Sequence, residues 1–513
     1  MAEKADVVET VKQGYAFEGA ALELGALLVD DEPAPEAAVR IPLGMMNRHG
    51  LVAGATGTGK TKTLQLMAEQ LSAAGVAVFA ADIKGDLSGV SQPGEGNDKL
   101  LVRTKSIGQD WTATGFPTEF YALGGQGTGI PIRATITSFG PVLLSKVLGL
   151  NDVQESSLGL IFHYADKAGL TLLDLKDLRA VITHLTSDEG KDDLKELGGL
   201  SAATAGVILR SLIGFADQGA EAFFGEPEFD TADLLQQRDG KGVISLLELP
   251  NLQDRPALFS TFLMWLLADL FHDLPEVGDV DKPKLVFFFD EAHLLFNDAS
   301  KAFLDSIAQT VRLIRSKGVG VFFVTQTPKD VPDDVLAQLG SRVQHQLRAH
   351  TPNDAKALKA TVSTFPSSSY DLGEVLTQLG IGEAIVTVMN EKGAPTPVAW
   401  TRLRAPQSLM APASAEQLTA TVQASANNAK YSQTLDRESA YEVLAAKVQA
   451  GAAQAEAEKQ QQEQAKQEPR PRAQKQEKSM VEQVVGSSAF KQFARSAGRE
   501  IVRGLFGAAR RRR

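Results

Sequence analysis

A glycine-rich stretch in the first hundred residues has the composition and spacing of a phosphate-binding loop. A short apolar run at 49–53 leads into Gly54, Gly59, Lys60 and Thr61, which match the pattern G-x-x-x-x-G-K-[ST], and a helical pattern follows at 62–74. Glycine permits backbone conformations in which successive N–H groups turn toward a phosphate. The following helix adds the positive end of its dipole at the same place. The stretch therefore predicts a nucleoside triphosphate site.

The side chains of this loop have separate expected roles. Lys60 is expected to reach the β- and γ-phosphates, and the Thr61 hydroxyl to bind Mg²⁺. A Gly/Thr turn that matches by chance is the alternative, and the strand before it and the helix after it disfavour that interpretation. The expected cofactors are ATP and Mg²⁺, and the expected nucleotide-binding residues are Gly54, Ala55, Thr56, Gly57, Thr58, Gly59, Lys60, Thr61 and Thr63.

A second chemical pair follows an apolar run at 286–289. Asp290 stands at the end of this expected strand and is predicted to bind Mg²⁺, which is a hard ion that favours a carboxylate ligand. Glu291 is the candidate base that orients the attacking water. The alternative is a strand that ends in two solvated acids. With a phosphate-binding loop in the same chain, the pair predicts hydrolysis rather than binding alone.

Asp290, Glu291, Ala292 and His293 also spell the DEAH box of two-domain helicases. Those enzymes need a second arginine-rich motif of the form Q-x-x-G-R-x-x-R, and the stretch at 338–342 lacks that spacing. We therefore interpret His293 as a packing or capping residue.

Thr325 and Gln326 end the next expected strand. A polar side chain at that position can sense the γ-phosphate and hold the water, and a loop-capping pair is the alternative. In a parallel sheet, Asp290, Glu291 and Gln326 would lie on adjacent strand ends. Gln326 is therefore a candidate catalytic residue together with Glu291 and Lys60.

Expected strands alternate with helical patterns along most of the chain. Apolar runs near 75–82, 242–249, 284–289, 318–326, 342–348 and 382–389 predict an α/β fold with a mostly parallel sheet. The expected organisation is a short amino-terminal segment at 1–40, a nucleotide-binding core at 41–91 plus 241–405, a mainly helical insertion at 92–240, a polar helical linker at 406–468 and a basic amphipathic tail at 469–513.

The amino-acid composition indicates the class of protein and its location. The 513 residues are 43% hydrophobic and 22% charged, which is typical of a globular protein, and they carry a net charge of −11. No cysteine is present, which excludes disulfides and thiolate metal sites and fits a cytoplasmic location. The most apolar run, 257–268, is shorter than the ~20 residues of a membrane span. No transmembrane segment and no signal peptide are expected.

Taken together, these motifs resemble the HerA/FtsK group of ring-forming P-loop ATPases, and among them the bacterial YjgR-like branch. The resemblance implies a RecA-like core, a homo-oligomer that is usually a hexameric ring with ATP between subunits, and DNA as a partner. It covers roughly residues 40–405 and rests on the phosphate-binding loop and on the stretches 82–86, 223–227, 274–279, 282–296, 311–326 and 339–345.

A ring of this kind needs a positive group from the neighbouring subunit beside the γ-phosphate. Arg342 is the first candidate for this arginine finger, and Arg315 and Arg312 are alternatives. Ordinary surface charge remains an equal interpretation for any one of the three.

Two features of the group are not expected here. Residues 1–40 are too few for the amino-terminal β-barrel of HerA proteins, and neither the membrane spans nor the winged helix of FtsK proteins is visible.

The leading hypothesis is an ATP-hydrolysing motor that acts on DNA as a translocase or helicase. The alternative is an ATP-dependent scaffold or regulator. A GTPase is disfavoured because no Asn-Lys-x-Asp motif is present.

The basic tail leaves three interpretations open. It has the composition to bind a nucleic-acid backbone, to lie on an anionic membrane surface or to act as a flexible solubilising segment.

Overall fold

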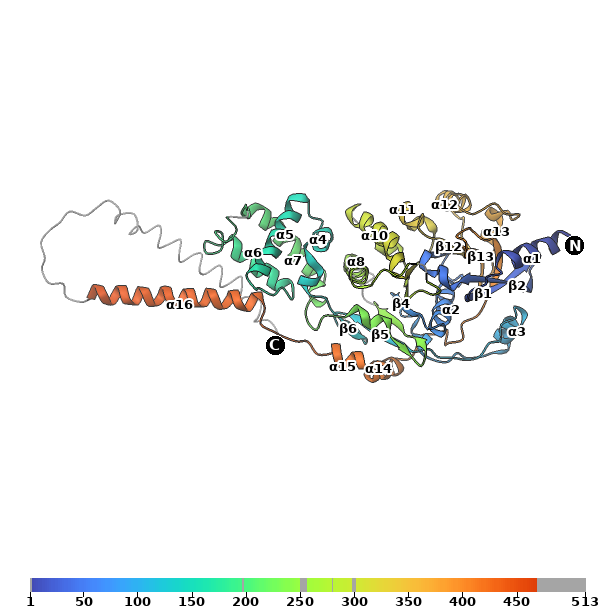
Figure 1. Cartoon of the computed structure of the whole chain (residues 1–513), viewed down its shortest axis with the longest axis horizontal. Coiled ribbons are helices and arrows are strands. Elements are labelled where there is room, and N and C mark those ends of the chain that lie inside the picture. The colour runs from blue at the N-terminus through green and yellow to red at the C-terminus, as the bar shows by residue number, and fades with distance from the viewer. Residues whose placement is uncertain (1, 196–197, 250–255, 279, 298–300, 468–513) are drawn as a thin grey trace. The chain divides into compact units, whose positions relative to one another are not determined.

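A computed structural model describes residues 2–195, 198–249, 256–278, 280–297 and 301–467 (Figure 1). Residues 1–446 form one compact unit, and a second unit begins at Lys447. In the described part of the chain, no helix is both long and apolar enough to cross a bilayer. The basic tail at 469–513 lies outside the described residues.

One 12-stranded sheet organises the first unit. Its order is β2-β1-β14-β13-β12-β3-β11-β10-β4-β9-β5-β6, and the strands from β12 to β6 run parallel to one another. β13, β14, β1 and β2 extend one side as antiparallel strands. The strands are β1 Ala21–Val29, β2 Glu32–Pro42, β3 Gly50–Ala53, β4 Ala77–Asp82, β5 Thr118–Leu123, β6 Ile130–Ile132, β9 Ile244–Glu248, β10 Leu285–Phe289, β11 Val319–Thr325, β12 Ser341–Gln344, β13 Glu383–Thr387 and β14 Ala399–Leu403, with a separate pair β7 Gln237–Arg238 and β8 Lys241–Gly242.

The central strands are buried along their whole length. β3, β4, β10 and β11 are unalternating apolar runs, and every residue in them is buried. Such runs suit strands that are covered on both faces. The predicted α/β class with a mostly parallel sheet is confirmed.

Two parts of the sheet were not predicted. Residues 1–40 were expected to be only a short segment before the core, yet β1 and β2 form a long antiparallel pair there. β5 and β6 lie inside the segment 92–240, which was expected to be mainly helical, and they extend the parallel sheet beyond β9. β2 carries Pro33, Pro35 and several alanines, which have low strand propensity, so pairing with β1 rather than local preference makes it a strand.

Helices cover the sheet and also form a group of their own. Within the segment 92–240, α4–α7 pack against one another (Figure 1). The longer helices are α1 Ala2–Gly14, α2 Lys60–Ala73, α3 Asp98–Ser106, α4 Ile136–Val147, α5 Asp152–Lys167, α6 Leu175–Thr186, α7 Ala202–Asp217, α8 Pro256–Asp273, α10 Lys301–Ile314, α12 Pro352–Val362, α14 Ala415–Ala424 and α16 Ala440–Gln467, and the shorter ones are α9 His293–Phe296, α11 Asp333–Leu336, α13 Leu372–Gln378 and α15 Ala426–Tyr431.

The residues after β14 pack on the core rather than leaving it as a linker. The buried carboxylate of Glu69, on α2, accepts hydrogen bonds from the backbone N–H groups of Gln407 (2.8 Å) and Ser408 (3.0 Å). Gln65, one turn earlier on α2, donates to the Ser408 hydroxyl at 2.7 Å. The linker expected at 406–468 therefore begins later, because polar groups of α2 hold its first residues in place.

Candidate active site

The glycine-rich loop joins the carboxyl end of β3 to the start of α2. Gly57 and Gly59 have φ values of 82° and 111°, which favour glycine. A Cβ added at Gly57 would meet no described atom within 4 Å, so this side of the loop is open to a ligand. A Cβ added at Gly54 would lie 2.4 Å from Cβ of His345, so the other side of the loop is closely packed. The loop therefore presents its open face away from the sheet.

Lys60 is folded onto this loop. Its Nζ donates to the carbonyl oxygens of Gly54 (2.7 Å) and Ala55 (3.1 Å). Burial lowers the pKa of Lys60, while the negative charges of Glu291 and Asp290 act in the opposite direction. The two acids therefore lie near enough to Lys60 for their charges to act on it.

Thr63 supports the loop from behind. Its hydroxyl lies 3.3 Å from the Gly59 carbonyl oxygen and 2.9 Å from Nε2 of His345, which is fully buried. Thr63 was expected to contact the nucleotide. Its side chain is buried and engaged within the fold, so its position fits a support for the loop instead.

Asp290 follows β10 and is buried, with 2% of its surface exposed. Its Oδ1 accepts the N–H of Glu291 at 2.9 Å, and its Oδ2 has no hydrogen-bond partner among the described residues. Burial, and then the charge of Glu291, raise the pKa of Asp290 to about 7. A buried carboxylate oxygen without a partner is the arrangement that a divalent cation would satisfy. The acid and the open loop therefore fit a nucleotide with Mg²⁺.

Glu291 lies between two basic side chains. Nζ of Lys84, from the loop after β4, pairs with Oε1 of Glu291. Nδ1 of His293 lies 3.2 Å from Oε2, close enough for an ion pair but poorly aligned for a hydrogen bond. The His293 contact and the Lys84 pair lower the pKa of Glu291 to about 2 against the opposing effect of burial. Glu291 also has a φ of 48°, an uncommon conformation for a residue with a Cβ.

The side chains of Thr325 and Gln326, at the end of β11, have different surroundings. β11 pairs with β10 on one side and β3 on the other, so these strand ends are adjacent as expected. Thr325 is buried and its hydroxyl donates to Asp330 at 2.7 Å. Gln326 is exposed and lines a cavity of about 240 Å³ with Ala55 and Thr56 of the loop. Gln326 therefore lies beside the glycine-rich loop, whereas Thr325 stabilises the turn.

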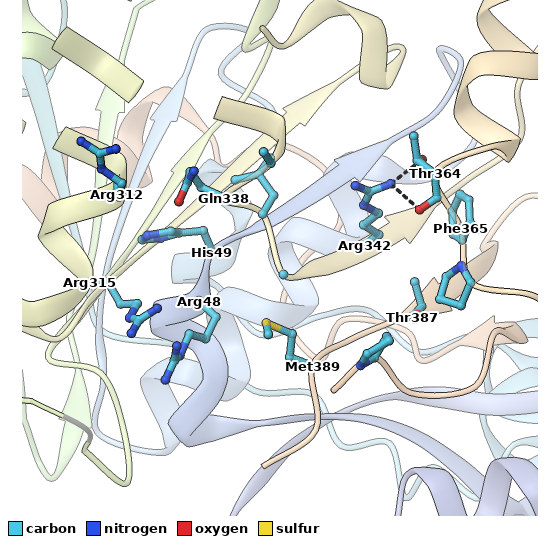
Figure 2. A pocket seen from close by; sticks show the side chains of 15 residues that line it. Arg48, His49, Arg312, Arg315, Gln338, Arg342, Thr364, Phe365, Thr387 and Met389 are labelled. Atoms are coloured by element: carbon cyan, nitrogen blue, oxygen red, sulfur yellow. Dashed lines mark hydrogen bonds between the residues drawn. The ribbon is translucent and has the colours of Figure 1, made fainter. Parts of the chain in front are cut away.

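The three candidate arginines lie in a different place. Arg312, Arg315 and Arg342 line one cavity of about 640 Å³ together with Arg48, and none of its described lining residues is acidic. Figure 2 shows Arg48, Arg312 and Arg315 on one side and Arg342 on the other.

The two sides of this arginine cavity differ in how their side chains are held. Arg342 donates to the carbonyl and hydroxyl oxygens of Thr364, the former at 3.2 Å. Arg312 and Arg315 are exposed.

Four further residues lie at these two regions that no sequence motif assigned to them. Lys84 lies in the stretch 82–86 and was given no role, and His293 was interpreted as a packing or capping residue. Arg348 donates to the Thr56 carbonyl oxygen at 3.2 Å and lines the same cavity as Gln326. Arg48 precedes β3 and joins the arginine cavity. His293 follows Glu291 by two positions, whereas the sheet brings Lys84 to Glu291 from a distant part of the chain.

Fold and site together define a RecA-like P-loop ATPase. Within that class the chain belongs to the Helicase HerA-like C-terminal family, whose profile matches residues 28–513. The predicted resemblance is thereby confirmed, and the chain is an ATPase.

Individual relatives agree with this assignment. The DNA double-strand break repair helicase HerA of Sulfurisphaera tokodaii is 22% identical over 376 residues, which cover 72% of this chain and 67% of that protein. A probable helicase of Methanocaldococcus jannaschii is 32% identical over 153 residues, 28% of each chain. Among solved structures, the plasmid coupling protein TrwB in complex with ADP and Mg²⁺ has the same fold, with a TM-score of 0.50 and 18% identity over 76% of this chain and 97% of that one.

Proposed function

We propose that this ATPase works as a ring of identical subunits, a hexamer by resemblance, and that it moves along or unwinds DNA. The observation that carries the ring is the separation of the arginine cavity from the P-loop. The DNA partner is supported by the relatives, which are named as DNA repair helicases.

The separation follows from the strands between the two regions. Arg48 precedes β3, and Arg342 pairs with Leu51 near the amino end of that strand, whereas the P-loop follows its carboxyl end. At about 3.3 Å per residue, the four residues of β3 separate the two edges by roughly 13 Å. The arginines are therefore badly placed to serve their own P-loop, and the γ-phosphate held by a neighbouring copy is the acceptor that we assign to them.

A ring offers this arrangement directly, because head-to-tail contacts place one edge of a subunit against the opposite edge of the next. Arg312 and Arg315 are better placed for this role than Arg342, since Arg342 already donates to Thr364. This reverses the order expected from the sequence.

Within one subunit we assign the remaining roles as follows. The loop and Lys60 hold the phosphates, and Thr61 with Asp290 holds Mg²⁺, which would draw charge from the leaving phosphate. Glu291 orients the attacking water and accepts its proton, and Gln326 reports on the γ-phosphate. The contacts that support these roles are the partnerless Oδ2 of Asp290 and the position of Gln326 beside Ala55 and Thr56.

The decisive measurement is ATP turnover with and without DNA. We expect both turnover and its salt dependence to change when duplex or single-stranded DNA is added, with Lys60→Ala as the inactive control. A rate that neither form of DNA alters would exclude the motor and leave an ATP-dependent scaffold. Native mass spectrometry with ATP tests the ring, and a strict monomer would exclude the shared site.

A further inference from the structure

The pairing of Lys84 with Glu291 blocks the group that must act as the base. A carboxylate that orients a water and accepts its proton needs an oxygen free for that water. Here Oε1 pairs with Lys84, and Oε2, which accepts no hydrogen bond from the described residues, is fully buried 3.2 Å from Nδ1 of His293. Only 6% of the surface of Glu291 is exposed. In this conformation Glu291 is held away from catalysis.

Lys84 is the partner that can leave. Its side chain is 42% exposed, whereas that of Glu291 is 8% exposed. The backbone beneath it is fixed, because the buried carboxylate of Asp82 accepts hydrogen bonds from the N–H groups of Gly85 (2.8 Å) and Leu87 (2.9 Å). A long, flexible ammonium on a fixed loop can exchange one anion for another without moving the strands.

The γ-phosphate is the competing anion that the site would bring within reach. Lys84 follows β4, which pairs with β10 directly beside Glu291. β3, β11, β10 and β4 are parallel neighbours in the sheet, so Lys60, after β3, and Lys84, after β4, extend from the same edge. Two cationic side chains then lie near the place where the triphosphate ends.

We propose that Lys84 is a γ-phosphate-dependent latch on Glu291. Without a γ-phosphate, Lys84 pairs with Glu291 and holds the base inactive. When ATP binds, Lys84 transfers to the γ-phosphate and frees Oε1 to receive the attacking water. ADP lacks the third phosphate and leaves the latch closed. This inference rests on the proposed role of Glu291 as the base, and it adds a residue that connects nucleotide state to that base.

A double-mutant cycle on nucleotide affinity tests the exchange. The affinities of ADP and of a non-hydrolysable ATP analogue are measured by calorimetry for wild type, Lys84→Met, Glu291→Gln and the double variant. The quantity compared is the ratio of the affinity for the ATP analogue to the affinity for ADP. If Lys84 must give up Glu291 to reach the γ-phosphate, Lys84→Met lowers this ratio less when Glu291 is present than when it is replaced. We expect the ratio to fall roughly twofold to threefold with Glu291 intact and about tenfold in the Glu291→Gln background, with ADP affinity unchanged.

Controls separate this latch from other effects. Lys329→Met removes another exposed lysine near the end of β11 and should not alter the preference for the ATP analogue over ADP in either background. Lys84→Arg should retain most of the preference, and Lys84→Gln replaces Lys84→Met if the latter unfolds. Equal losses in both backgrounds, or no loss in either, would overturn the latch. If the wild-type chain binds neither ADP nor the ATP analogue, the P-loop assignment itself is wrong.

Discussion

The hydroxyl of Thr63 lies 2.9 Å from Nε2 of His345, behind the P-loop. Thr63 belongs to the helix that follows the loop, and His345 directly follows β12, so the contact joins two elements far apart in sequence. Cβ of His345 also blocks any side chain at Gly54. The loop is therefore supported from behind by one buried imidazole.

Stability should fall in mild acid because of this imidazole. Burial, and then the charge of Lys60, hold the pKa of His345 at about 4, below its ordinary value near 6.5. Between pH 6.5 and 4 the imidazole is protonated in the unfolded chain but stays neutral in the folded chain. The free energy of unfolding therefore has its full value above pH 6.5 and falls as the pH decreases toward 4. The upper limit is on the order of 3 kcal/mol.

Unfolding in urea at several pH values checks this expectation. His345→Gln should unfold more easily at pH 8 and should show a shallower decline toward pH 5. Burial likewise lowers the pKa of His49 to about 4, so some decline should persist in that variant. His350→Gln replaces an exposed histidine and should behave like wild type. Identical pH slopes for wild type and His345→Gln would contradict the assignment.

Lys60→Ala should remove tight nucleotide binding. The ammonium is positioned on the loop by the carbonyls of Gly54 and Ala55, and no other side chain of the loop carries a positive charge. Charge-assisted contacts to phosphate are strong, so we expect ATP affinity to fall about 100-fold. Calorimetry measures this directly, with Lys329→Ala as a matched surface control. Affinity within twofold of wild type would show that the phosphates bind elsewhere.

Glu291→Gln should retain ATP binding and lose hydrolysis. The amide keeps the shape of the side chain but is a poor proton acceptor, so turnover should drop by about 10²–10⁴-fold. Single-turnover hydrolysis and ATP affinity, measured on the same preparation, separate the two effects. Turnover close to wild type would remove Glu291 from the role of base.

Removal of the trans arginine should be rescued by mixing subunits. Arg312→Ala and Arg315→Ala should each bind ATP, and the variant that lacks the finger should lose turnover by about 10³–10⁵-fold. Lys60→Ala subunits bring intact arginines to the neighbour's P-loop, so adding them should restore part of the activity. Arg342→Ala is tested in parallel. If no mixture recovers activity, the arginines do not act between subunits.

Local sequence patterns predicted the central part of the sheet correctly. β3, β4, β10 and β11 are continuous apolar runs, and such runs suit strands that are covered on both faces. They did not predict β2 and β5. The alanines and prolines of β2 favour no strand by themselves, and β5 lies in a stretch interrupted by glycine and proline. Both strands exist because a neighbouring strand supplies hydrogen bonds that local propensity cannot reveal.

The sequence by itself determined the nucleotide chemistry of this protein. Gly54 to Thr61 form a contiguous motif and Asp290 adjoins Glu291, so their relative positions are set by a few covalent bonds. The tertiary structure alone decided which groups surround them. Lys84 meets Glu291 across 207 residues, and Thr63 meets His345 across 282. The arginines gather at the edge opposite the P-loop, because each parallel strand carries its two ends to opposite edges of the sheet.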